Sequence, residues 1–125
     1  SRYKYLVKHI TTVGNVGIGT QTTGSFKLAV EGTIGAREIK VTSVNPWPDY
    51  VFQTSYALPT FTDIENYIQA HQHLPGMPSA AEINESGGVE LGEMNRKLLE
   101  KVEELTLHLI QVNKRVEELE KQIKQ

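Results

Sequence analysis

The sequence of 125 residues contains no cysteine. Disulfide cross-links and thiol chemistry are therefore excluded. Aromatic residues make up only 7% of the chain, and apolar residues outside the last third are thinly spread. We therefore expect that one copy of the chain has difficulty building a self-sufficient core.

The sequence also lacks a strong charge of one sign and a long apolar run. Its 13 Lys and Arg against 15 Asp and Glu give a formal net charge of −2, which argues against a general nucleic-acid-binding surface. No apolar stretch approaches the roughly 20 residues that cross a bilayer, and no signal-peptide pattern is present. Because the first residue is Ser1 rather than methionine, we expect the chain to be part of a longer polypeptide.

Residues 1–44 are predicted to form a glycine- and threonine-rich β segment. YKYLVKHITTV is rich in β-branched and aromatic residues, and residues 27–30 and 37–41 are short strand-like runs set apart by glycines. GNVGIG does not predict a dinucleotide site, because no long helix follows it and its third glycine is misplaced. Strands this short bury little alone, so we expect them to pair with other strands or with other chains.

Residues 45–90 are predicted to form a compact segment of two short helices joined by a turn. Thr60 with Asp63, and Ser79 with Glu82, have the spacing of capping boxes. The first helix has one apolar face, which consists of Ile64, Tyr67, Ile68 and His71. Pro75 lies after this helix, and SGG at residues 86–88 is expected to end the second one.

Residues 91–125 carry the most regular pattern, with apolar residues spaced 4-3-4-3-4-3-4. These seam residues are Leu98, Val102, Leu105, Leu109, Val112, Val116, Leu119 and Ile123. The spacing predicts a coiled coil in which Val102 is at position a and Leu98 is at position d. The alternative is a long helix that packs on its own domain, but its apolar stripe would have a period of 3.6 rather than 3.5.

The number of helices in the coil is predicted from its flanks. The β-branched residues at a favour a dimer, but Leu109 at a and Val112 at d weaken that preference. RVEELE, with Arg115 at g and Glu120 at e, resembles the signature of three-stranded parallel coils. In such coils the Arg stem covers the seam, and its guanidinium pairs with a Glu of the neighbouring chain. We therefore predict a homotrimer.

A second apolar stripe lies beside the seam, at Leu99, Leu107 and Ile110. Because such a stripe is unfavourable in water, we expect residues 45–90 of the same or a neighbouring chain to cover it. His108, at position g, is expected to lie on the surface.

The sequence offers little for catalysis or for a cofactor. Acidic residues in the middle segment lie near helix ends, where carboxylates serve as caps, and no Ser-His-Asp set is recognisable. His71 and His73 are the candidate metal ligands, since three chains around an axis would supply six imidazoles, which suit Fe, Zn or Ni. The alternative, which we expect, is a packed or capping pair without a metal or other cofactor.

Several longer phrases of the chain resemble a known family. GNVGIGT with KLAVEGTIGAREIKV, and then WPDYVF, HLPGMPSAAEI and LGEMNRKLLEKVEELTLHLI, resemble the C-terminal domain of phage and phage-like tail-fibre proteins. The resemblance implies an α+β homotrimeric fibre tip with strands intertwined at its N-terminal end and a closing parallel coiled coil. It implies a structural, non-enzymatic role outside the cell, on a phage-like particle or a cell-surface fibre.

The chain is also distantly similar to the intramolecular chaperone domain of endosialidases and other tail spikes. That family trimerises a fibre and then cleaves itself off, using a serine nucleophile near a Ser-Asp-x-x-x-Lys opening. This sequence reads EIKVTSVNPWPDY instead, and Ser43 lacks the Asp partner. No catalytic residue is therefore assigned, although a self-cleaving chaperone remains an alternative.

Two functional hypotheses follow. In the first, the chain is a trimerisation and tip domain that holds three chains in register and nucleates fibre folding, because its local coil can form before non-local strand pairing. In the second, Trp47, Tyr50 and Tyr56 contact a cell-surface sugar or protein receptor. Exposure of these aromatic side chains would favour the second hypothesis, and burial of Trp47 the first.

Overall fold

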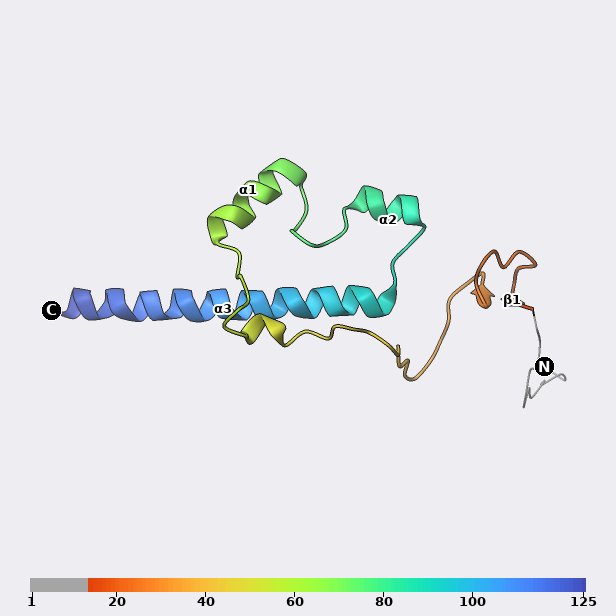
Figure 1. Cartoon of the computed structure of the whole chain (residues 1–125), viewed down its shortest axis with the longest axis horizontal. Helices are drawn as coiled ribbons and strands as arrows, with labels where there is room; N and C mark the ends of the chain where they lie inside the picture. Colours follow the sequence, from red (N-terminus) through yellow and green to blue (C-terminus); the bar gives the residue numbers. More distant parts are fainter. Residues whose placement is uncertain (1–13) are drawn as a thin grey trace. The chain divides into compact units, whose positions relative to one another are not determined.

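The structure is a computed structural model that describes residues 14–125, and it contains both short strands and a long C-terminal helix (Figure 1). The protein is thus a small α+β protein, as predicted. The predicted β run YKYLVKHITTV, residues 3–13, lies outside the described residues. The chain divides into two units with the boundary between Ile39 and Lys40, and each unit is described separately.

The first unit contains the strands β1 (Val16–Ile18) and β2 (Leu28–Val30), which pair in parallel. The Val16 N–H donates to the Lys27 carbonyl at 2.8 Å, and the Glu31 N–H donates to the Ile18 carbonyl at 2.9 Å. The strand predicted over residues 27–30 is confirmed in β2. β1 lies inside GNVGIG, where no strand was predicted.

The strand predicted over residues 37–41 is wrong for the described chain, because these residues have no regular secondary structure there. A strand must satisfy its backbone groups on a neighbouring strand. β1 and β2 pair with each other and form a sheet of two strands, so residues 37–41 have no partner in it.

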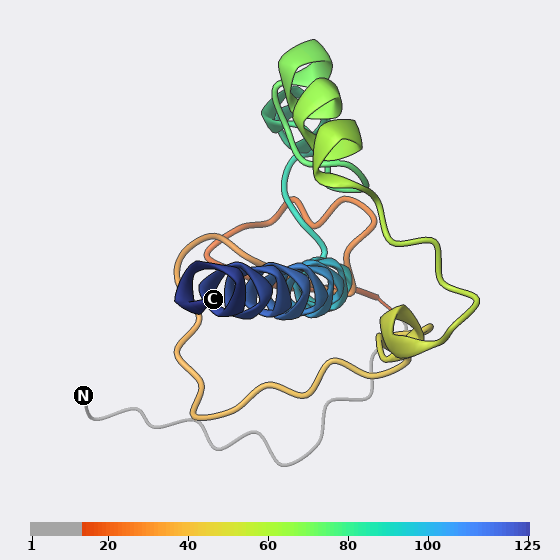
Figure 2. The same ribbon diagram turned by 90° about the vertical axis from the view of Figure 1, so that its left-hand side faces the viewer.

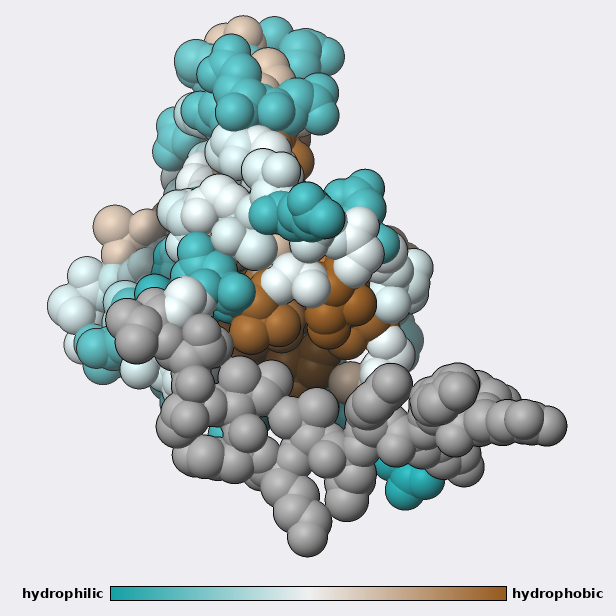
Figure 3. All heavy atoms as spheres, turned by 90° about the vertical axis from the view of Figure 1, so that its right-hand side faces the viewer, coloured by the Kyte–Doolittle hydropathy of each residue, from teal (hydrophilic) through white to brown (hydrophobic). Residues whose placement is uncertain are grey.

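The first unit buries few of its apolar side chains. Its large apolar residues that are more than half exposed are Ile18, Phe26, Leu28, Ile34 and Ile39. A ladder of two short strands is marginal in water without a packed face. Figure 3 shows a brown patch of apolar residues at the surface, with more hydrophilic residues beside it.

The second unit contains the helices α1 (Phe61–His71) and α2 (Ala80–Ser86). Thr60 caps α1, since its hydroxyl accepts from the Asp63 N–H at 3.1 Å. Ser79 and Glu82 form the reciprocal capping box of α2, and Gly87 ends it in the left-handed region with φ 82°. Both predicted helices are confirmed, because capping chemistry acts within one turn of the chain.

The turn between these helices is confirmed at Pro75 and Gly76. The Met77 N–H donates to the Leu74 carbonyl at 3.2 Å, and Gly76 has φ 76°. Proline followed by a residue with positive φ is the arrangement of a type II turn, which favours glycine at the second position.

The helix α3 (Leu91–Lys124) has 34 residues and matches the segment predicted as helical. A short 3-10 helix, η1 (Tyr50–Phe52), lies beside it. α1, the turn and α2 form an arm, defined as residues 61–88, that projects to one side of α3 in both views (Figures 1 and 2).

Candidate functional site

One face of α3 is covered by the chain's own middle segment. Val51 of η1 is buried on this face, at 2% exposure. Nearer the start of α3, Val41 and Val44 lie so close to Gly92 that a Cβ added there would come within 2.5 Å and 2.9 Å of their methyl groups. Glycine at position 92 therefore allows the extended chain to approach the helix.

Polar side chains hold η1 and the following loop on this face. The Tyr50 hydroxyl donates to Glu100 and accepts from the Arg96 guanidinium at 3.0 Å, while the Tyr56 hydroxyl donates to Glu104. Burial, and then the neighbouring carboxylates, raise the pKa of both tyrosines. Lys101 pairs with Glu104 at 2.9 Å. The tyrosine contacts join residues that are 46 to 50 positions apart in the sequence, so they anchor the loop to the helix.

Glu103 is buried on the same face at 6% exposure. Burial, followed by the charges of Asp49 and Glu100, raises the pKa of Glu103. Its Oε2 atom is buried without a hydrogen-bond partner among the described residues. The covered face therefore contains a buried carboxyl group whose protonation is linked to folding.

His108 was predicted to lie on the surface, and this prediction is wrong. It is 4% exposed, and its ring stacks on Phe61 with centroids 4.2 Å apart. The loop that leads into α1 crosses the helix at this position, which the heptad pattern alone does not reveal. Both ring nitrogens are buried without a hydrogen-bond partner among the described residues.

The second apolar stripe is only partly covered. Leu99 and Leu107 are half-buried, whereas Ile110 is 46% exposed. The middle segment of the same chain thus covers this stripe incompletely.

The seam residues are exposed. They are Leu98, Val102, Leu105, Leu109, Val112, Val116, Leu119 and Ile123, with exposures between 41% and 83%. At about 100° per residue, the covered Arg96 and Glu103 lie roughly opposite Leu105 on the helix. The chain therefore packs mainly away from the seam and leaves the seam residues exposed.

Arg115 and Glu120 are also exposed on α3. Arg115 pairs within its own helix with Glu118 at 3.3 Å, and both side chains are more than 60% exposed. A surface ion pair of this kind is weak in water, so Arg115 loses little when it exchanges Glu118 for a carboxylate that is better shielded from solvent.

His71 and His73 pack around Tyr67 rather than facing each other. Their ring centroids lie 4.3 Å and 5.4 Å from that of Tyr67 and 6.1 Å from one another. His73 Nδ1 also lies 3.0 Å from the Leu74 carbonyl oxygen. Residues 14–125 contain no group of three or more His, Asp or Glu side chains arranged to hold a metal ion.

The three aromatic residues proposed as receptor contacts differ in exposure. Trp47 is 54% exposed, whereas Tyr50 and Tyr56 are half-buried and have their hydroxyls engaged by glutamates. Only Trp47 among these three therefore presents most of a ring to solvent.

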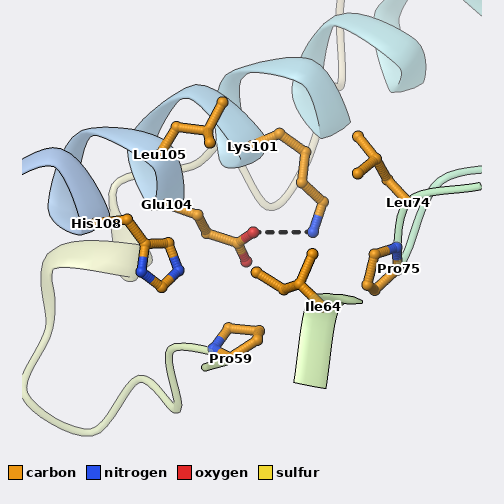
Figure 4. Close-up of a pocket in the computed structure, with 8 residues that line it drawn as sticks. All are labelled: Pro59, Ile64, Leu74, Pro75, Lys101, Glu104, Leu105 and His108. Carbon is orange, nitrogen blue, oxygen red and sulfur yellow. Dashed lines mark hydrogen bonds and ion pairs between the residues drawn. The ribbon is translucent and has the colours of Figure 1, made fainter. Parts of the chain in front are cut away.

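A pocket of about 100 Å³ lies between α3 and the arm (Figure 4). Its lining residues are Pro59, Ile64, Leu74, Pro75, Lys101, Glu104, Leu105 and His108. Sites for drug-sized ligands usually measure about 300–1,000 Å³. The pocket is thus smaller than a typical small-molecule site, and it lies beside the seam through Leu105.

No helix among the described residues is long and apolar enough to cross a membrane. Comparison of the chain with protein-family models, with curated proteins and with solved structures gave no match.

Proposed function

We propose that this chain is the C-terminal trimerisation domain of a tail-fibre-like protein, and that it holds three chains in register without catalysing a reaction. The observation that carries the proposal is the seam face of α3. Its eight apolar side chains are exposed, while the chain packs its own loops against the opposite face.

Burial of the seam supplies the driving force. Removing a Val, Leu or Ile side chain from water contributes about 1.5–3 kcal/mol when burial is complete. The eight seam residues of all three chains together contribute more than the roughly 4–15 kcal/mol of lost translational and rotational freedom at each association step. The first unit also has exposed apolar side chains, and their burial on association would contribute favourable free energy in the same way.

Three chains are favoured over two by Arg115 and Glu120. In a parallel coil, position g of one helix faces position e of the next heptad on a neighbour. Arg115 then reaches Glu120 of that neighbour and covers the seam with its aliphatic stem. The likeness to tail-fibre C-terminal domains in HLPGMPSAAEI and LGEMNRKLLEKVEELTLHLI supports the same arrangement. On this proposal the domain belongs to a phage-like particle or a cell-surface fibre.

The proposal is tested by the mass of the protein in solution, measured by light scattering coupled to size exclusion. We expect a particle of three chains of 14.0 kDa each that persists on dilution. A monomer would contradict the proposal, and a stable dimer would contradict the trimer. Intact mass spectrometry of the same sample tests the alternative of self-cleavage, which predicts two fragments in place of one chain.

Receptor binding is a second candidate function, and the exposure of Trp47 favours it. This residue is the single tryptophan of the chain, so its fluorescence reports on a ligand at this place. We expect cell-surface glycans that bind here to shift the emission of Trp47, and Trp47→Phe to weaken their binding, because the smaller ring offers less stacking surface. Glycan binding that is unchanged in Trp47→Phe would remove this residue from the binding site.

A further inference from the structure

The arm is poorly packed on its own chain. Neither α1 nor α2 contains a buried residue, and the two helices stand to one side of α3 (Figure 2). The arm nevertheless carries apolar side chains, among them Leu74 at 44% exposure and Ile68 at 39% exposure. A helical segment of this kind gains most of its stability from tertiary packing. The single chain supplies little tertiary packing for the arm.

The arm lies along one particular edge of the seam. Where it meets α3, the pocket is lined by Leu105 at position d and by Lys101 and His108, which are both at position g (Figure 4). The outer wall of the same pocket comes from the arm and includes Ile64 and Leu74. The g edge of the helix therefore presents an apolar hollow next to the seam.

The opposite edge of the seam is apolar as well. Leu99 and Thr106 occupy position e, and Ile110 lies one turn beyond Thr106 on the same side. The Thr106 hydroxyl donates to the Val102 carbonyl at 2.8 Å, so it needs no further partner when an apolar surface covers it. Thr106 and Ile110 are exposed and Leu99 is half-buried, so this e-edge stripe of Leu99, Thr106 and Ile110 is only partly covered by the described part of the chain.

A parallel three-stranded coil brings these two edges together. Equal residues of the three helices lie at equal heights, and the g edge of each helix faces the e edge of its neighbour. Thr106 of one chain is therefore level with Leu105 of the next, beside the pocket. Leu99 and Ile110 then lie above and below it, at about 8 Å from the pocket centre along the axis.

We propose that the arm of each chain docks on the e-edge stripe of the neighbouring chain's α3. The contact is heterologous and is repeated three times, so it closes around the three-fold axis. The occupant of the exposed arm surface is a second copy of this chain. This inference rests on the proposed trimer. It gives the arm a role that the seam does not have, because docking of the arm fixes which neighbouring chain each middle segment contacts.

The absence of cysteine makes a direct test possible. The double variant Leu74→Cys with Thr106→Cys places one thiol on the arm and one on the e edge. Within one chain the two residues lie on different sides of α3, since Leu74 lines the g-side pocket. Under mild oxidation we expect disulfides between chains, seen as covalent dimers and trimers on a denaturing gel without reductant. The matched control is Leu74→Cys with Asn113→Cys, which moves the second thiol about 10.5 Å further along the same edge and should lose most of the cross-linking.

The outcomes separate the two proposals. A disulfide within one chain overturns trans docking, and so does the lack of cross-linking in a sample whose mass is that of a trimer. Both results leave the trimerisation function intact. A monomeric mass for the unmodified protein overturns the proposed function together with this inference.

A second measurement does not depend on disulfide geometry. Thr106→Arg places a long charged side chain on the e edge, and we expect amides of residues 61–71 to lose protection from hydrogen exchange in the trimer. Gln111→Arg adds the same charge at the exposed position c and should leave that protection unchanged. Equal exchange in the two variants would contradict docking of the arm at the e edge.

Discussion

Val116→Asp is expected to dissociate the trimer into monomers. Val116 occupies position a, is 45% exposed in the single chain and belongs to the part of α3 beyond residue 109, where all residues are exposed. In the trimer, three carboxylates would meet at the axis. Each chain loses the about 1.5–3 kcal/mol that burial of the Val116 side chain contributes. The cost of burying unpaired like charges adds to this loss. Because every 1.4 kcal/mol is a tenfold change, we expect the dissociation constant to rise by more than about a hundredfold.

The measurement is light scattering over a dilution series, with circular dichroism to follow the helix. Gln111→Asp is the matched control, since it adds the same charge five residues away at an exposed position off the seam. We expect this control to remain a trimer. A trimer of unchanged stability in Val116→Asp would show that the assigned register of the seam is wrong.

Glu103→Gln is expected to stabilise the protein at pH 7 and to have little effect near pH 4. The folded chain raises the pKa of Glu103 above its ordinary value of 4.5, so the folded state holds a proton more tightly than the unfolded state. Stability from this group is complete below pH 4.5 and is lost as the pH rises through the folded pKa. Glutamine keeps the shape and cannot ionise. The variant should therefore keep that stability at neutral pH and melt a few degrees higher there.

The comparison requires melting curves of both proteins at several pH values and at one protein concentration, because the stability of an oligomer depends on concentration. Glu117→Gln is the matched control, since Glu117 occupies the same heptad position two heptads later and is exposed. The carboxyls of Glu82 and Glu93 have lowered pKa values, caused by hydrogen bonds from Ser79 and from Arg96. Their contribution to folding stability increases with pH, and it does so equally in both proteins. A constant difference from pH 4 to pH 8 would contradict the role assigned to Glu103.

Short-range chemistry was predictable from the sequence. Thr60, Ser79 and Glu82 cap helices at the positions expected of them, and Pro75 with Gly76 makes the turn between α1 and α2. The 34-residue extent of α3 follows from the sustained apolar period of residues 98–123. In each case the interacting groups lie within a few residues of one another, so the sequence contains both partners of the interaction.

The predictions that were wrong concern longer distances. The strand expected at residues 37–41 depends on a pairing partner that the described chain does not supply. His108 was assigned to the surface, but Phe61 stacks on it across 47 positions of sequence. A heptad position states which side of a helix a residue occupies, and it does not state whether a distant loop crosses that side.

By itself, the sequence determined the three α-helices, the strand β2 and the apolar seam pattern that predicts association. The tertiary structure decided which face of α3 the chain uses for itself. Tyr50 and Tyr56 bind glutamates on one side of the helix, and the seam residues remain exposed. The physical reason is that helical periodicity is a local property, whereas the covering of a face requires loop residues about 50 positions away to find their partners on the folded helix.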